Sequence, residues 1–462
     1  MSITAMRLTK YPLESLMSTT TVASLIILPL LCLIATMPVS EALSSATKSS
    51  KVVVVGLNAA LQKRFVLSPS AKLVPGSVHR ADHMEEGVGG KGQDVAISLS
   101  CLVSDKRKMD DDEEMDIALA QFIGAGAEGE QVLSLLRTNF CLDDALTVRP
   151  EAKLRTCTTI VGSDCSTELV EPSGSIQQDE LDSLMAKVHA KCGGGDNDAS
   201  VVDALCIMGS MPPGCPSETY ADIYSRAAAD NTLVLIDSVV GVQPLLQSLS
   251  TGKKKGAVLK INASELCRLA NVEQEESTSE ADKTSEKDIR KAVTSFFQTF
   301  KVGKGALDYM AITDGRHPAH LVEILKDDNE DASSPSFQIL KMDVIDLLST
   351  NDNEPITLYP IGAGDTVAAG TLAAWQCLSS FQGEQDQKQS RNLLSRKVQD
   401  LLATKRKAWG LTANIENDDM ALAFAFGLAC GSASCLQEEN SVFEVEDAMG
   451  LLGKMGKPQS LS

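Results

Sequence analysis

The sequence lacks several patterns that reveal a function directly. Its 462 residues include 12 cysteines, but no Cys-x-x-Cys pair and no cluster of cysteine and histidine with the spacing of a zinc site. A structural zinc site is therefore not predicted, and most of the cysteines are expected to be buried thiols. Two pairs, Cys157 with Cys165 and Cys430 with Cys435, lie close enough in sequence to suggest a redox role as an alternative.

Positive charge is also scarce. The chain has 42 Lys and Arg residues against 62 Asp and Glu residues, a formal net charge of −20, which argues against a nucleic-acid partner held by simple phosphate neutralisation. The surplus acid is concentrated in polar segments that we interpret as solvated insertions, at about 104–115, 272–288, 326–337 and 382–418. The sequence contains no internal repeat.

Uninterrupted hydrophobic runs long enough to cross a bilayer are missing, although a strongly apolar stretch stands near the N-terminus, where residues 22–34 follow Arg7 and Lys10. This pattern predicts a cleavable signal-type presequence over residues 1–50. The alternative is a membrane anchor that is not cleaved, and membrane contact is expected through this segment only.

The rest of the chain has the pattern of an α/β domain. Short apolar runs at 52–55, 233–237 and 309–312 alternate with helical patterns, as is typical of a parallel sheet covered by helices on both faces. Two segments, 63–82 and 155–172, instead mix Thr, Val and charged residues around turn residues. With 43% hydrophobic residues, the chain can bury one large core over residues 51–462.

The most informative motif is the run from Gly362 to Asp365. A Gly-Ala-Gly turn that opens into a helix directs backbone N–H groups at the positive end of the helix dipole, where a phosphoryl group could be held. The carboxylate of Asp365 would then take the proton from an attacking hydroxyl. The alternative is an ordinary helix start with an aspartate near its N-cap.

Three further motifs support this interpretation. A glycine-rich turn at 86–92 contains Lys91 and enters a second helix, which suits an anionic or hydroxyl-rich substrate, although no Walker pattern is present. The turn at 209–214 follows an apolar run, and open α/β sheets bind ligands at such strand ends. Asn262 and Glu265 follow another strand, where the alternative is a capping box.

These motifs, in this order, resemble the PfkB/ribokinase family of carbohydrate kinases, and most closely its hexose phosphate kinases, such as 1-phosphofructokinase and tagatose-6-phosphate kinase. The resemblance extends from about Lys51 to the C-terminus. It implies a ribokinase-like α/β fold, with a central mostly parallel sheet, helices on both faces and a small β lid formed by the segments 63–82 and 155–172. Smaller matches lie at 57–61, 75–80, 154–156, 167–174, 421–425 and 431–433.

The resemblance also implies roles for single residues. Asp365 would be the general base, and the backbone of Gly362, Ala363 and Gly364 would stabilise the transferring phosphoryl group. The substrate-binding residues would be Asn58, Gln62, Gly89, Gly90, Lys91, Asp94 and Arg155. Of these, Arg155 is expected to grip a phosphate already on the substrate, helped by Arg80 and Lys91, because a guanidinium matches phosphate geometry.

ATP and Mg²⁺ are the implied cofactors. Asn262, Glu265, Thr313 and Gly315 would bind ATP, and the first two would organise Mg²⁺ through water, because this ion gives up its waters reluctantly. The partner is thus a small molecule, a sugar or sugar phosphate. Lids in this family often pair between subunits, so a homodimer through the lid is also an expectation.

Three departures from the family pattern fall on the sugar side of the site. Gln62 stands where the family has an acidic residue, Asp94 stands where it has an asparagine, and Cys157 or its neighbour replaces a second asparagine. Because glutamine both donates and accepts whereas an ionised aspartate only accepts, the hydrogen-bonding pattern of the pocket differs. The alternative is that the first two changes compensate each other and the same sugar binds.

The sequence thus predicts ATP-dependent phosphoryl transfer to a hydroxyl of a sugar phosphate. Phosphorylation of an unphosphorylated sugar or a nucleoside is the alternative, and a catalytically silent scaffold or regulator is the alternative of another class. Because an ATP-dependent enzyme with a signal-type presequence is unusual in secretion, we expect delivery to a plastid, with a Ser/Thr-rich transit stretch at 44–50. The secretory pathway and a membrane-anchored form are the alternatives.

Overall fold

This computed structural model describes most of the chain after the presequence. The described residues are 51–68, 71–103, 116–162, 166–192, 202–273, 283–302, 305–325, 336–348, 358–380, 394–411 and 416–461. They all fall within one structural unit, residues 47–462. The predicted presequence 1–50, the insertion 104–115, Cys165, most of the insertions 272–288 and 326–337, and parts of the insertion 382–418 lie outside the described residues.

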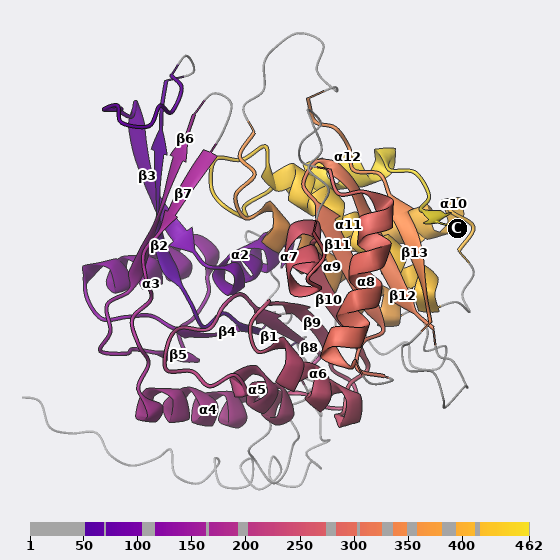
Figure 1. Ribbon diagram of the computed structural model, residues 1–462, viewed down its shortest axis with the longest axis horizontal. Helices are drawn as coiled ribbons and strands as arrows, with labels where there is room; N and C mark the ends of the chain where they lie inside the picture. The colour runs from indigo at the N-terminus through magenta and orange to yellow at the C-terminus, as the bar shows by residue number, and fades with distance from the viewer. Residues whose placement is uncertain are drawn as a thin grey trace, which may run out of the picture. The chain divides into compact units, whose positions relative to one another are not determined.

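The main sheet has ten strands in the order β14-β13-β12-β11-β10-β9-β8-β1-β4-β5 (Figure 1). The strands from β5 to β11 in this order run parallel, and β12, β13 and β14 extend one edge in antiparallel pairing. The strands are β1 Lys51–Val55, β4 Asp116–Phe122, β5 Thr147–Val148, β8 Ala204–Met208, β9 Leu233–Asp237, β10 Gly256–Asn262, β11 Tyr309–Asp314, β12 His317–Ile324, β13 Phe337–Met342 and β14 Gln459–Leu461.

Helices cover both faces of this sheet because each central strand is apolar on both sides. Val52 and Val54 of β1 face one hydrophobic cluster, and Val53 and Val55 face the other. The first face carries α2 Lys91–Val103, α3 Ala127–Phe140, α9 Ala363–Ser380, α10 Arg396–Ala408, α11 Glu416–Ser434 and α12 Val445–Lys454. The second carries α4 Gln178–Cys192, α5 Thr219–Ala227, α6 Val242–Thr251, α7 Ala263–Leu269 and α8 Glu286–Phe300.

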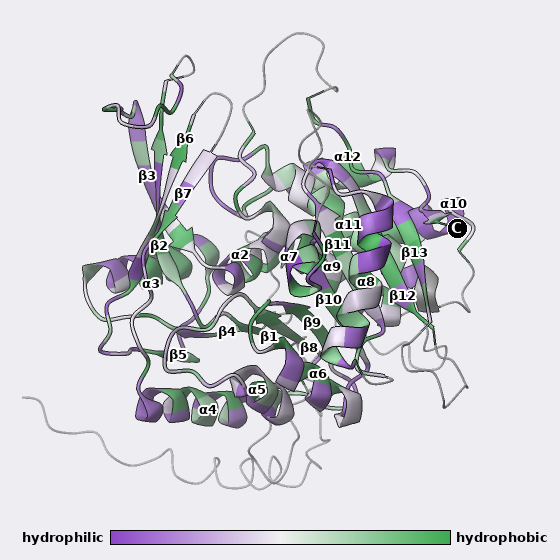
Figure 2. Cartoon of the chain, in the orientation of Figure 1, coloured by the Kyte–Doolittle hydropathy of each residue, from purple (hydrophilic) through white to green (hydrophobic). Residues whose placement is uncertain are grey.

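Hydropathy follows these layers. The strands β1, β8 and β9 are green in Figure 2, whereas hydrophilic purple lies on exposed sides of α4 and α8. The structure therefore confirms the predicted α/β fold with a mostly parallel central sheet. None of the helices in the described part of the chain has both the length and the apolar character needed to cross a membrane.

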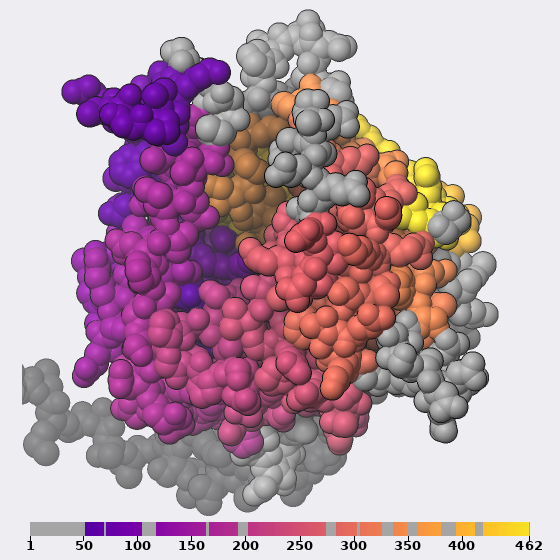
Figure 3. Space-filling model, viewed as in Figure 1, coloured from indigo at the N-terminus to yellow at the C-terminus, as the bar shows by residue number. Residues whose placement is uncertain are grey.

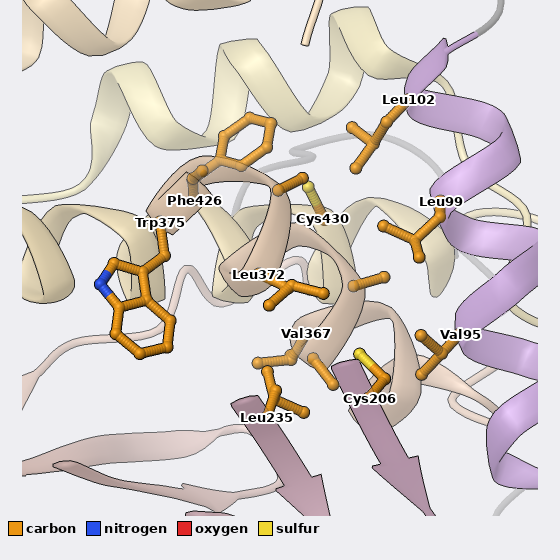
Figure 4. Packing of buried hydrophobic residues seen from close by; sticks show 14 of the residues in the cluster. Val95, Leu99, Leu102, Cys206, Leu235, Val367, Leu372, Trp375, Phe426 and Cys430 are labelled. Atoms are coloured by element: carbon orange, nitrogen blue, oxygen red, sulfur yellow. The ribbon is translucent and has the colours of Figure 1, made fainter. Parts of the chain in front are cut away.

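Close packing on the first face fixes the start of α9. In Figure 4, Val95 and Leu99 of α2 lie beside α9, which directs Val367 and Leu372 into the same cluster. Cys430 of α11 packs against α9 as well. Because interiors pack at the density of organic crystals, this contact leaves α2 and α9 little freedom to slide, and it holds their N-terminal ends in fixed positions.

A second sheet of four strands stands beside the main one, in the order β3-β2-β6-β7 (Figure 1). Its strands are β2 Ala60–Val66, β3 His83–Gly89, β6 Arg155–Val161 and β7 Ser166–Val170. We refer to this sheet as the lid. The segment predicted at 155–172 supplies β6 and β7, whereas the segment at 63–82 supplies the end of β2 and the connection that follows.

One local prediction is wrong. Residues 86–89, interpreted from their glycines as part of a turn, belong to strand β3, which continues to Gly89. The reason is pairing with β2, where Gln62 lies opposite Gly87 and Ala60 opposite Gly89, so the backbone hydrogen bonds of the strand offset the low β-propensity of glycine.

Candidate active site

The candidate site lies at the carboxyl edge of the parallel strands, where open α/β sheets bind ligands. β9 ends at Asp237, the neighbouring β10 ends at Asn262, and α9 begins at Ala363. Figure 3 shows a hollow in the viewed face between the lid and the salmon-coloured residues beyond 260, with indigo atoms of the early part of the described chain at its floor.

The turn before α9 requires glycine at its first position. Gly362 has φ +80°, and a Cβ atom there would lie 2.1 Å from the Oγ of Ser441. The Ser441 hydroxyl donates to the carbonyl oxygen of Gly362 at 3.2 Å, and the Thr366 hydroxyl donates to the same oxygen at 3.0 Å. The N–H of Ala363 donates to the carbonyl of Pro360 at 3.2 Å, so this N–H is already engaged within the turn.

Asp365 lies in the first turn of α9 and is 9% exposed. Its Oδ1 is buried and has no hydrogen-bond partner among the described residues. Burial raises the pKa of Asp365 to about 7, the charges of Asp237 and Glu265 add to the rise, and Lys91 and Lys260 oppose it. A carboxyl group in this state can accept a proton near neutral pH.

Four charged side chains form a connected group beside Asp365. Lys91 donates to Oδ1 of Asp237 at 2.7 Å and to Oε1 of Glu265 at 3.3 Å, and Lys260 donates to Oδ2 of Asp237 at 2.7 Å. We refer to these four residues as the lysine cluster. Although burial would raise the pKa of Asp237, the two ammonium groups hold it below its ordinary value. The two positive and two negative charges of the lysine cluster therefore balance each other.

A second carboxyl group is buried near Asp365. Asp94, in the first turn of α2, is 6% exposed, and its Oδ1 also has no hydrogen-bond partner among the described residues. Burial, followed by the charge of Asp365, raises the pKa of Asp94 well above its ordinary value, whereas a hydrogen bond with Ser441 opposes the rise. We refer to Asp94 and Asp365 as the carboxyl pair.

Gly89 and Gly90 connect β3 to α2 at a place where neighbouring backbone and side-chain atoms approach closely. Gly90 has φ +116°, and a Cβ atom there would lie 2.4 Å from Oε1 of Gln93 and 3.2 Å from the Cα of Ala59. Gly89 lies against Gln62, whose Nε2 donates to the Thr159 hydroxyl at 2.7 Å within the lid. The motif therefore brings the lid, the end of β1 and α2 together.

Two predicted substrate residues are tied to one another at the end of β1. Arg155 donates from its guanidinium to the carbonyl oxygens of Asn58 and Ala59, at 2.8 and 3.3 Å. The side chain of Asn58 donates to the Ser210 hydroxyl at 2.9 Å and accepts from the Ser173 hydroxyl at 2.7 Å. Part of the Arg155 guanidinium is therefore already bound by protein.

The residues predicted to bind ATP occupy two adjacent strand ends. Asn262 caps α7 by accepting from the N–H of Glu265 at 2.7 Å, and the Glu265 carboxylate accepts from the Asn262 N–H at 3.3 Å, which is the capping box given as the alternative. Thr313 pairs with Asn262 in the sheet, and Gly315, at φ +57°, lies in the turn from β11 to β12. Lys91, in contrast, engages two of its three ammonium donors within the lysine cluster.

Sequence reasoning missed Asp237, Lys260 and Ser441. Asp237 and Lys260 each stand within an apolar strand, and a buried charged residue at such a place is the signal that could have identified them. A Cβ atom on Gly364 would lie 3.0 Å from Nζ of Lys260, so this ammonium group lies beside the turn. Ser441 gives no local signal, because its partner Gly362 is 79 positions away in sequence.

Comparison with known proteins identifies the class to which this fold and site belong. A model of the pfkB family of carbohydrate kinases matches residues 49–334, and the chain belongs to this family. The matched region contains Lys91, Asp237, Lys260 and Glu265, and it ends before the turn that begins at Gly362.

Individual relatives agree with the family. A tagatose-6-phosphate kinase from Staphylococcus epidermidis is 25% identical over 198 residues, which cover 42% of this chain and 55% of the relative. A 1-phosphofructokinase from Xanthomonas campestris is 25% identical over 193 residues, covering 41% and 53%. The chain therefore spans about half the length of the curated relatives it matches.

Solved structures show the same fold at low identity. Phosphofructokinase-2 from Escherichia coli, solved with substrates and products, superposes with a TM-score of 0.55 and 18% identity, covering 87% of this chain and 98% of that one. Ribokinase from Giardia lamblia gives a TM-score of 0.55 at 12% identity, covering 87% and 100%. The predicted ribokinase-like fold is thereby confirmed.

Proposed function

We propose that this protein is a kinase that transfers the γ-phosphoryl group of ATP to a hydroxyl of a sugar phosphate. The observation that carries the proposal is the buried Oδ1 of Asp365, which has no partner among the described residues and lies in the first turn of α9. Burying a carboxyl group without a hydrogen-bond partner costs free energy, and such groups are concentrated at catalytic sites.

In this mechanism Asp365 takes the proton of the attacking hydroxyl, and its pKa of about 7 suits a general base near neutral pH. The N–H groups of Gly364 and Asp365 serve as the anion hole, because the N–H of Ala363 is engaged with Pro360. Lys260, whose Nζ lies beside Gly364, adds positive charge where the transferring phosphoryl group would pass.

ATP and Mg²⁺ are the cofactors in this proposal. When bound to the nucleotide phosphates, Mg²⁺ neutralises their charge. Within the described residues, no group of three or more His, Cys, Asp and Glu side chains is arranged to hold a metal ion directly. Both carboxylate oxygens of Glu265 accept hydrogen bonds from protein, so Asn262 and Glu265 suit contact with Mg²⁺ through water, with Thr313 and Gly315 near the nucleotide.

We propose that the acceptor is bound by residues at the end of β1, in the lid and at the start of α2, namely Asn58, Gln62, Gly89, Gly90, Asp94 and Arg155. Arg155 would hold the substrate phosphate with the guanidinium N–H groups that Asn58 and Ala59 do not use. An unphosphorylated sugar or nucleoside is the second candidate, because Lys91 is committed to the lysine cluster and Arg155 to backbone carbonyls.

We also propose that the lid pairs with the lid of a second copy. Apolar side chains are exposed on its strands and on the connection from β2 to β3, at Val74, Val78, Met84, Leu169 and Val170. Their burial against another lid would remove apolar surface from water. Light scattering of the wild type and of Leu169→Glu tests this, with a dimer for the former and a monomer for the latter as the expected result.

Delivery to a plastid through residues 1–50 stays a proposal from the sequence. A fluorescent protein fused after residue 50 should be found in plastids, and fluorescence that stays in the cytosol would contradict it.

The function itself is tested by ATP consumption with Mg²⁺ against a panel of hexose phosphates, free sugars and nucleosides. We expect turnover with a phosphorylated acceptor that is lost in Asp365→Asn. Turnover with unphosphorylated acceptors alone would favour the second candidate. Well-folded protein that binds ATP without turnover of any acceptor would favour a catalytically silent member.

A further inference from the structure

A buried arginine of the lid contacts the loop that supports the start of α9. Arg64, on β2, is 5% exposed and lies on the same face of the strand as Gln62. Its guanidinium donates to the backbone carbonyl of Glu438 and to the side-chain oxygen of Asn440, in the segment between α11 and α12. It also pairs with Glu85 of β3 at 3.1 Å.

The same guanidinium reaches the segment that leads into Gly362. Its Cζ lies 5.7 Å from the centre of the Tyr359 ring, a distance at which a cation and an aromatic face attract. Tyr359 in turn donates from its hydroxyl to Glu438 at 3.1 Å and from its N–H to the carbonyl of Cys435 at 2.8 Å. Arg64 therefore touches both segments that meet at the turn.

Ser441, the residue after Asn440, connects this loop to the turn before α9. Ser441, at φ +61°, donates to the carbonyl oxygen of Gly362, and its own carbonyl accepts from the Ser98 hydroxyl of α2 at 2.8 Å. The hydroxyl oxygen of Ser98 also lies 3.0 Å from the hydroxyl oxygen of Thr366 in α9. A series of short contacts thus runs from the lid strand through Asn440 and Ser441 to the turn before Asp365.

A cavity of about 270 Å³ lies at this junction. Gln62, Arg64 and Val88 line it from the lid, and Ile97 and Asn440 line it from the main unit. At this cavity the Arg64 guanidinium bridges the lid and the 438–441 loop on the opposite side. A buried guanidinium with a fork of donors is suited to fix two segments at once.

We propose that Arg64 is a positioning residue, which clamps lid strand β2 to the 438–441 loop and thereby aligns the acceptor held under the lid with Asp365. This proposal rests on the proposed function, in which the lid covers the acceptor. Loss of the clamp is expected to weaken acceptor binding and phosphoryl transfer together, and to leave ATP binding unchanged.

The test compares Arg64→Met, Arg64→Lys, Asn440→Asp and the double variant Arg64→Lys with Asn440→Asp. Lys63→Met is the matched control, because Lys63 is the neighbouring residue of β2 and pairs with Glu86 at 3.1 Å where both side chains are about one-third exposed. For each protein the acceptor KM, kcat, ATP affinity and melting temperature are measured. Hydrogen exchange of residues 60–66 and 436–442 is measured without substrates.

For Arg64→Met we expect kcat/KM for the acceptor to fall about 10- to 100-fold while ATP affinity stays within about twofold, because a misaligned acceptor loses rate steeply. Exchange in both segments should rise. The double variant should recover most of the loss of Arg64→Lys, because a lysine and an aspartate can form one charge-assisted bond across the same gap. Lys63→Met should resemble the wild type.

The proposal is overturned if Arg64→Met matches Lys63→Met in acceptor kinetics, or if ATP affinity and melting temperature fall along with acceptor binding, which would indicate a merely structural role. Should the wild type phosphorylate no acceptor, the proposed function fails, and the exchange of the two segments still decides whether Arg64 clamps the lid. Unchanged exchange in Arg64→Met would then overturn the clamp.

Discussion

The lysine cluster and the carboxyl pair both lie at the carboxyl edge of the main sheet, and they differ in how their charges are balanced. In the lysine cluster, Asp237 accepts hydrogen bonds of 2.7 Å from Lys91 and from Lys260. In the carboxyl pair, Asp94 and Asp365 each keep a buried oxygen without a partner among the described residues. Compensated charge holds strand ends together, whereas uncompensated charge is a site where a proton can be exchanged.

The comparison also bears on the charge of Lys91, for which the sequence predicts a role at the substrate. Although burial would lower the pKa of Lys91, the surrounding Asp237, Asp365 and Glu265 hold it above its ordinary value. Lys91 therefore stays charged and supports the site from within. Its positive charge also opposes the rise in the pKa of Asp365, so the two groups act on each other.

The largest effect is expected from Asp365→Asn. Removal of a general base lowers the rate about 10²- to 10⁴-fold, so kcat of this variant should fall within that range. Steady-state kinetics with a responsive acceptor measures it, and binding of ATP should persist. A variant that keeps more than a tenth of the wild-type rate would show that Asp365 is not the base.

The same substitution should raise stability at alkaline pH. Since the pKa of Asp365 is raised to about 7 from an ordinary 3.8, its contribution to stability is complete below pH 3.8 and is lost as the pH rises through 7. A neutral asparagine has no such loss. Chemical denaturation should therefore find Asp365→Asn more stable than the wild type at pH 8.5, and this advantage should shrink as the pH falls to 5.5.

Asp237→Asn is expected to have the opposite effect on stability. It leaves the buried Lys260 and the partly exposed Lys91 without their shared carboxylate, and breaking the buried pair of Lys260 and Asp237 is expected to cost about 3–5 kcal/mol. Urea unfolding measures this loss. The control is Lys397→Ala, which breaks an exposed pair with Glu446 and should cost no more than about 0.5 kcal/mol. Equal losses of unfolding free energy in the two variants would contradict the distinction between the lysine cluster and an exposed ion pair.

A smaller loss is expected at the start of α7. Asn262→Ala removes the capping box with Glu265 and should cost about 1 kcal/mol, whereas Asn262→Asp keeps a side-chain acceptor and should cost less. Comparing the ATP affinity of the two variants separates capping from nucleotide binding. If both bind ATP as the wild type does, Asn262 is a cap alone.

The smallest effect is expected from Asp94→Asn. Burial and the charge of Asp365 raise the pKa of Asp94 well above its ordinary value and so favour the neutral form, which, like an amide, can both donate and accept hydrogen bonds. We therefore expect kcat/KM within about twofold of the wild type and the same pH dependence. If the acid limb of the plot of kcat/KM against pH moves to lower pH in this variant, Asp94 is ionised in the wild type.

Much of the fold and part of the site could be predicted from the sequence because the signals are local. Apolar strands such as 233–237 predict a parallel sheet, and the capping box at Asn262 and Glu265 is visible three positions apart. The contacts that organise the site are not local. Lys91 meets Asp237 across 146 positions, and Arg64 meets Asn440 across 376, so no spacing in the sequence indicates either pairing.

Titration of Asp365 in the ligand-free protein shows whether this carboxyl group can take up a proton near neutral pH. Infrared difference spectra of the wild type and Asp365→Asn, recorded between pH 5 and pH 9, isolate the carboxyl signal of this residue. We expect a carboxylic acid band that converts to a carboxylate band with a midpoint near pH 7, in agreement with a pKa of about 7 for Asp365. A signal that is fully carboxylate at pH 5 would contradict it, because Asp365 would then be an ordinary ionised aspartate.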